Sequence, residues 1–76
     1  MTSPMIAEPI ITHEEHLETL IQRRIGNRVR DLRVVVQPAG LILQGRAATY
    51  HAKQLAQHAA MDLSQRRILA NEIEVY

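Results

Sequence analysis

The segment Leu32–Gly45 (LRVVVQPAGLILQG) decides the fold of this 76-residue chain. In its first part, Leu32–Gln37, apolar side chains occupy every second position, which is typical of a strand with one buried face. Pro38 has no N–H to donate to a strand ladder and Gly40 tolerates positive φ, so a turn is expected here. Leu41–Gly45 then runs back as a second strand. The segment therefore predicts a β-hairpin.

A helix is predicted on each side of this hairpin, and a third strand at the C-terminal end. Thr12 followed by Glu15 has the spacing of a capping box, and Gly26 supplies the end of the first helix. Thr49 is a good N-cap for the second helix, and Leu69–Val75 alternates like a strand. The side chains expected to face the core are Leu17, Leu20, Ile21 and Ile25 of the first helix, Ala52, Leu55, Ala56, Ala59 and Leu63 of the second helix, and Leu32, Val34, Val36, Leu41, Leu43, Leu69, Ile73 and Val75 of the strands.

This order, αββαβ, predicts an α+β fold. We expect a two-layer sandwich in which two helices cover one face of a three-stranded mixed sheet. The crossover through the second helix is expected to place the last strand beside the first, so that the first strand is central. Residues 27–31 are expected to form a polar connection, and Gly45 to mark a bulge or a close approach of a helix.

The composition indicates one small globular domain. Seventy-six residues leave no room for a second core, and 46% hydrophobic residues is normal for a globular chain. Residues 1–11 contain two prolines and no periodicity, so we expect a flexible tail, in which Ile10 and Ile11 pack down as a hydrophobic staple. Residues 12–76 are then the single domain.

The composition also limits the cellular compartment. The chain has no cysteine, which excludes disulfides, thiolate metal sites and a lipid anchor on an N-terminal cysteine. Its N-terminus has neither the basic residues nor the long apolar run of a signal peptide. No stretch approaches the roughly 20 apolar residues of a membrane span. We therefore expect a cytoplasmic protein.

Residues in four parts of the chain form an ordered set. They are Val34–Val36 in the first strand, Gly40, Leu43 and Gly45 in the hairpin, Ala52 and Lys53 in the second helix, and Asn71–Val75 (NEIEV) at the end. In this ordered set the chain resembles a BON domain, the module of osmotically induced periplasmic proteins and nodulation proteins. The resemblance covers residues 14–76. It implies the αββαβ fold, no catalytic activity by itself, and a binding role, often suggested to be at phospholipid surfaces. In this chain Gln65 and Arg66 stand where the family commonly has Gly-Val.

Arginine is concentrated in the middle of the chain. Eight of the nine basic residues are arginines, and arginine binds phosphate and carboxylate groups in a bidentate manner. One interpretation is an anion-binding patch. The other is structural: arginines at the end of the first helix complement its dipole, and Arg33 and Arg46 pair across strands with Glu72 and Glu74. The candidate anion patch consists of Arg23, Arg24, Arg28, Arg30 and Arg33.

The sheet face that points away from the helices is a second candidate surface. Alternation places Val35 and Ile42 on this face among charged side chains. Apolar residues on an exposed face are often tolerated surface, but they also mark contacts with a partner. We take Val35, Ile42, Arg46, Glu72 and Glu74 as a candidate interface with a protein partner or with a second copy of the chain.

No catalytic, cofactor-binding or metal-binding motif is recognised in the sequence. His13 and His16 lie one helical turn apart, but they have no third ligand nearby and do not form the HExxH motif of zinc sites. The serines have no fixed histidine and acid partners, and the three glycines match no phosphate or dinucleotide loop. We therefore expect no enzymatic activity, no cofactor and no metal.

These observations lead to one main functional hypothesis. In this hypothesis the chain is a small non-catalytic binding module of BON type that contacts a protein partner or itself through the open sheet face. The alternative is binding to anionic phospholipid surfaces through the arginine patch. Nucleic-acid binding is a second alternative, and the lack of stacking aromatic side chains on the strands argues against it.

Overall fold

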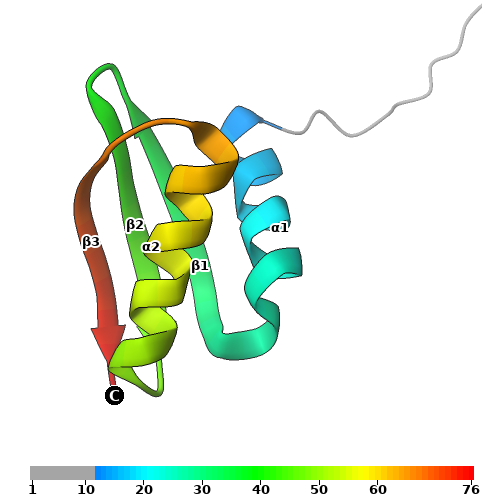
Figure 1. Ribbon diagram of the computed structural model, residues 1–76, viewed down its shortest axis with the longest axis vertical. Helices are drawn as coiled ribbons and strands as arrows, with labels where there is room; N and C mark the ends of the chain where they lie inside the picture. Colours follow the sequence, from blue (N-terminus) through cyan, green and yellow to red (C-terminus); the bar gives the residue numbers. More distant parts are fainter. Residues whose placement is uncertain (1–11) are drawn as a thin grey trace, which may run out of the picture.

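The structure, a computed structural model, describes residues 12–76. It has the predicted α+β fold in the order αββαβ, with a three-stranded mixed sheet and both helices on one of its faces (Figure 1). The predicted tail and the staple of Ile10 and Ile11 lie outside the described residues. The elements are helix α1 His13–Ile25, the short 3-10 helix η1 Gly26–Arg28, strand β1 Val29–Gln37, strand β2 Gly40–Ala47, helix α2 Tyr50–Ser64 and strand β3 Ile68–Val75.

Local capping interactions fix the helix ends as predicted. The Glu15 N–H donates to Thr12 Oγ1 at 3.0 Å and the Thr12 N–H donates to Glu15 Oε1 at 3.1 Å, which completes a capping box. Helix α1 ends at Gly26, whose φ of 71° suits glycine. In α2 the Ala52 N–H donates to the Thr49 hydroxyl at 3.0 Å, so the predicted N-cap is confirmed.

Strand β1 begins earlier than predicted and contains a bulge. The polar connection predicted over residues 27–31 is wrong, because Val29 is almost fully buried in the core and begins the strand. Asp31, with φ of 55°, lies in this bulge. Between the pairs Arg30–Arg46 and Arg33–Gln44, β1 has one residue more than β2. Gly45 lies opposite this bulge, and a Cβ atom on it would be 2.9 Å from Val29 Cγ1 and 3.0 Å from the Arg30 carbonyl oxygen. The predicted bulge is confirmed, and the element that approaches Gly45 is β1 rather than a helix.

The prediction that the first strand is central is wrong. The sheet order is β1–β2–β3, with β2 antiparallel to β1 and parallel to β3. Helix α1 closes the outer edge of β1: the Val34 N–H donates to Glu18 Oε2 at 2.9 Å, and the Val36 N–H donates to Glu14 Oε2 at 2.8 Å. Because these N–H groups are already bonded, β3 pairs with the other edge of the hairpin, on β2. Helix α2 directly follows β2 and carries the chain across to that edge.

The core between the helices and the sheet is aliphatic. Its largest fully buried side chains are Val29, Ile21, Leu41, Leu43 and Ile73, which come from α1 and all three strands. Alanines bury one side of α2, so this helix can lie close to the sheet. The buried alanines are Ala52, Ala56, Ala59 and Ala60. The predicted core leucines Leu20, Leu55 and Leu63 are only half-buried.

Two core positions predicted in β3 are wrong. Leu69 and Val75 were assigned to the core by alternation, but their side chains are 43% and 46% exposed. The pairing of β3 with β2 shifts at the start of β3, where Ile68 pairs with Leu41 and the next pair already involves Ala70. Ile68 therefore packs against the core in place of Leu69.

Asn71 connects β3 to α2. Its side-chain Nδ2 donates to the Lys53 carbonyl oxygen at 3.1 Å and to Gln57 Oε1 at 3.2 Å. Its Oδ1 accepts from the Ile73 N–H at 3.2 Å. The asparagine that contributes to the BON resemblance thus has a structural role in this chain, because it holds the helix layer against the last strand.

Candidate interaction surfaces

Both helices lie on the same side of the sheet, so no described element covers the opposite side (Figure 1). We call this opposite side the open sheet face. Strand alternation and the pairing register decide which side chains it carries. They are Arg30, Arg33, Val35 and Gln37 of β1, Ile42, Gln44 and Arg46 of β2, and Ala70, Glu72 and Glu74 of β3. The structure therefore brings all five residues of the candidate interface onto one surface.

An apolar row crosses the open sheet face. Val35 pairs with Ile42, and Ile42 pairs with Ala70, so the three side chains lie in line across the three strands. All three are half-buried. They remain partly in contact with solvent because the helices pack on the other side of the sheet. The sequence predicted two members of this row but not Ala70, whose place depends on the register of β3.

Two charged rows lie on one side of the apolar row, the first next to it and the second beyond the first. They are Arg33–Gln44–Glu72 and Arg30–Arg46–Glu74, each written from β1 through β2 to β3. In the first row Gln44 Nε2 donates to Glu72 Oε1 at 3.2 Å, which links β2 and β3. Each row has arginine on β1 and glutamate on β3. The open sheet face is therefore positive along one edge strand and negative along the other.

The predicted cross-strand ion pairs do not form among residues 12–76. Arg33 and Glu72 lie on opposite edge strands, because β2 separates β1 from β3. Arg46 lies opposite Glu74 in the register, but its guanidinium lies over the ring of Tyr76, 5.3 Å from the centroid. This is a cation–π distance. For Arg33 the error follows from the wrong choice of central strand, whereas Arg46 lies beside the strand of Glu74 and contacts Tyr76 instead.

The arginines of the candidate anion patch do not form one surface. Arg23 and Arg24 lie in the last turn of α1, Arg28 lies in η1, and the two β1 arginines belong to the open sheet face. Arg24 Nη1 also forms an ion pair with Asp62 Oδ2 of α2 at 2.7 Å. Both side chains of this pair are well exposed, at 48% and 65%, so it holds the two helices together only weakly.

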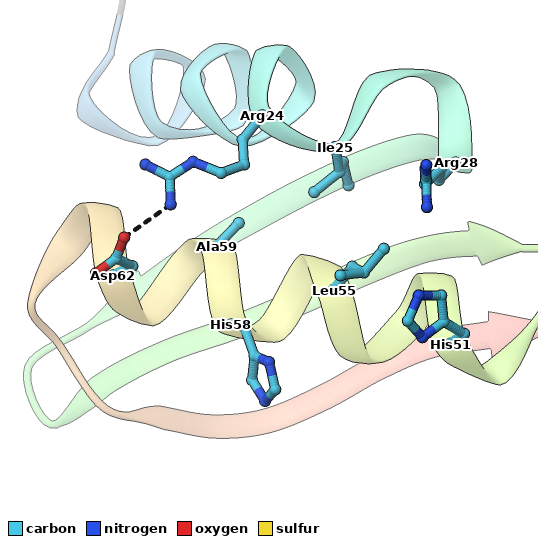
Figure 2. A pocket seen from close by; sticks show the side chains of 8 residues that line it. All are labelled: Arg24, Ile25, Arg28, His51, Leu55, His58, Ala59 and Asp62. Atoms are coloured by element: carbon cyan, nitrogen blue, oxygen red, sulfur yellow. Dashed lines mark hydrogen bonds and ion pairs between the residues drawn. The ribbon is translucent and has the colours of Figure 1, made fainter.

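A groove of about 600 Å³ lies between α1 and α2 (Figure 2). Its apolar part comes from Ile25, Leu55 and Ala59, and the Arg24–Asp62 ion pair spans one end. The rest of its lining is Arg28, His51 and His58. No polar or charged side chain is buried among the described residues, so the groove offers no desolvated group that would anchor a small ligand. The sequence did not predict this groove, because it depends on how the two helices pair.

The first turn of α1 carries the two histidines considered as metal ligands. His13 and His16 are both exposed. Across residues 12–76 no group of three or more His, Cys, Asp or Glu side chains is placed to hold a metal ion. In the same part of the chain, no helix combines the length and the apolar character that crossing a membrane requires.

No family model, curated protein or solved structure shows a significant match to this chain. The resemblance to the BON domain therefore stays a prediction based on the residues given above. The function has to be inferred from the surfaces of the domain itself.

Proposed function

We propose that this chain is a small non-catalytic interaction module, of the kind that the BON resemblance implies, which binds a protein partner or a second copy of itself through the open sheet face. The observation that supports this most is the apolar row Val35–Ile42–Ala70 on a face that no described element covers. Covering apolar surface is favourable by roughly 25 cal/mol per Å². A partner on this face would complete the burial of three side chains that the domain leaves half-buried.

The surroundings of the apolar row support an interface as well. Protein interfaces combine an apolar centre with a polar rim, and charged side chains in the rim set orientation and encounter rate. On the open sheet face the charged rows form such a rim on one side of Val35, Ile42 and Ala70, and Gln37 lies on the other side, toward the hairpin turn. The groove between the helices offers neither a contiguous apolar row nor a buried polar anchor.

Binding to anionic phospholipid, which the resemblance also implies, has less support. Arg24 is engaged by Asp62, and the arginines of α1 and β1 lie in different layers. Flotation with neutral and with anionic liposomes tests this alternative. Recovery that requires anionic lipid and is lost in Arg23→Glu/Arg28→Glu would favour it over the open sheet face.

The main test uses the double variant Val35→Glu/Ile42→Glu and a matched control. Met61→Glu also places a carboxylate on an exposed apolar position, but on α2, where the Met61 side chain is 43% exposed. Circular dichroism first establishes that both variants fold. Each protein is then used as bait in native lysate, and its mass in solution is measured by light scattering.

We expect the double variant to lose the captured protein, or the self-association, that wild type and Met61→Glu both retain. The physical reason is that two carboxylates in the apolar row must be desolvated when a partner covers it. If a folded double variant kept the same mass and captured the same proteins as wild type, the open sheet face would not be the binding surface.

A further inference from the structure

The charge on the open sheet face is divided between its edge strands. Arg30 and Arg33 lie on β1, Glu72 and Glu74 lie on β3, and β2 separates the two sets. Such a face is complementary to itself when one copy is turned over so that its β1 lies on the β3 of the other copy.

A two-fold axis lying between two open sheet faces can run along the strands or across them, and these two limiting arrangements pair the charges differently. A two-fold axis along β2 exchanges the edges, so Arg33 meets Glu72 of the partner subunit and Arg30 meets Glu74 of the partner subunit. A two-fold axis across the strands lays β1 on β1 and β3 on β3, which brings like charges together. From the first arrangement we infer that the partner of the open sheet face is a second copy of this chain, docked about a two-fold axis nearly parallel to β2. This inference rests on the proposed function, because it names the partner of the same surface.

The same axis lays the apolar row on itself. Ile42, on the central strand, meets Ile42 of the partner subunit, and Val35 meets Ala70 of the partner subunit. The arrangement has one adverse contact, because Arg46 also lies on the central strand and meets Arg46 of the partner subunit. Arg46 is exposed in the domain, its guanidinium lies over the Tyr76 ring, and its row is the last one of the open sheet face, at the rim of the contact. Four Arg–Glu contacts, two from each charged row, oppose this single repulsion.

Association through a sheet edge is disfavoured by the same structure. On β1 the N–H groups of Val34 and Val36 are bonded to side chains of α1, which blocks that edge from pairing. On β3, a second copy paired antiparallel about Ile73 would place Glu72 opposite Glu74 of the partner subunit. Like charges directly opposite each other destabilise strand pairing. The open sheet face, whose charges are complementary in the arrangement above, is therefore favoured over these two edge pairings.

The small size of the open sheet face predicts a weak dimer. Three strands about 4.8 Å apart and seven residues of about 3.3 Å each give a flat area of roughly 14 by 23 Å. The area of this rectangle is well below the roughly 800 Å² that each partner buries in a standard interface. We expect a dissociation constant between about 10 μM and 1 mM. The dimer is therefore to be sought at high protein concentration.

Two complementary charge reversals test the geometry. Arg33→Glu places a carboxylate opposite Glu72 of the partner subunit, and Glu72→Arg places a guanidinium opposite Arg33 of the partner subunit. Each variant alone is expected to dimerise at least about tenfold more weakly than wild type, since like-charge contacts are repulsive. In an equimolar mixture the two variants form a heterodimer in which both contacts join opposite charges, so association should return to about the wild-type level. Arg23→Glu, on α1, is the control and should dimerise like wild type.

Sedimentation equilibrium over a concentration series, against the 8.7 kDa mass of one chain, provides the measurement. Circular dichroism checks that each variant folds, and if one does not, Arg30→Glu and Glu74→Arg repeat the design in the second charged row. A wild-type chain that is monomeric at millimolar concentration would overturn the inference, and so would a mixture that associates no better than its components. In either case the capture experiment with Val35→Glu/Ile42→Glu still decides the proposed function, so the two failures are distinguishable.

Discussion

Gly45→Ala is expected to destabilise the domain strongly, because strand β1 approaches this residue closely. Gly45 has φ of 151°, a conformation that side chains with a Cβ rarely adopt. The added Cβ would lie 2.9 Å from Val29 Cγ1, 3.0 Å from the Arg30 carbonyl oxygen and 3.3 Å from Leu32 Cα. Two of these three atoms belong to the backbone, so β1 itself has to move to accept the methyl group.

The expected loss has two contributions. Holding a residue in a sparsely populated backbone conformation costs about 1–3 kcal/mol, and overpacking a well-packed site costs about 1–3 kcal/mol more. The two contributions add to about 2–6 kcal/mol, and we expect the free energy of unfolding to fall by about 4 kcal/mol, the middle of this range. A domain of this length has a total stability of roughly 4–11 kcal/mol, so the variant should be close to the limit of folding.

Gly26→Ala is the matched control for this experiment. Gly26 also has positive φ, at 71°, but a Cβ on it would meet nothing within 4 Å. Its replacement should cost only the backbone strain of this conformation, with φ of 71° and ψ of −146°, about 1–3 kcal/mol. Urea unfolding followed by circular dichroism measures both changes. Equal losses for Gly45→Ala and Gly26→Ala would refute the close approach of β1 at the bulge. In a Val29→Ala background Gly45→Ala should cost less, because the nearest contact is gone.

Two further predictions concern interactions of the helices. Glu14→Ala/Glu18→Ala removes the acceptors of the Val34 and Val36 N–H groups and should lower the free energy of unfolding by about 2–3 kcal/mol; hydrogen exchange should accelerate at these two amides, and unchanged exchange would contradict a closed β1 edge. Thr49→Ala removes the N-cap of α2 and should cost about 1 kcal/mol, whereas Thr49→Ser keeps a hydroxyl acceptor and should cost less, as thermal unfolding of both variants would show.

The helices and the hairpin were predictable because interactions between near neighbours determine them. The capping box of Thr12 and Glu15 and the hydroxyl cap at Thr49 join residues three positions apart. The hairpin turn follows from Pro38 and Gly40. All residues of each signal lie within a short stretch of chain, so the signal does not depend on how distant parts of the chain pack.

The start of β1 and the inward side of β3 were mispredicted because they depend on neighbours far away in the sequence. The bulge at Asp31 is matched by Gly45 on the opposite strand, and neither residue alone indicates where the extra position lies. In β3, Leu69 fits the alternation of an isolated strand. Its exposure results from the shift in pairing after Ile68, which is a property of the sheet.

The sequence by itself determined the helices, the hairpin and the third strand, their order in the chain, and the side chains of the hairpin that face the helices, because periodicity, caps and turns are local. Only the tertiary structure decided that β2 is the central strand. That decision depends on which edge of the hairpin is free, and Glu14 and Glu18 of α1 close the edge of β1. With β2 in the middle, the arginines of β1 and the glutamates of β3 lie on opposite edges. Arg33 and Glu72, which the sequence suggested would pair within the chain, therefore stay apart across the open sheet face.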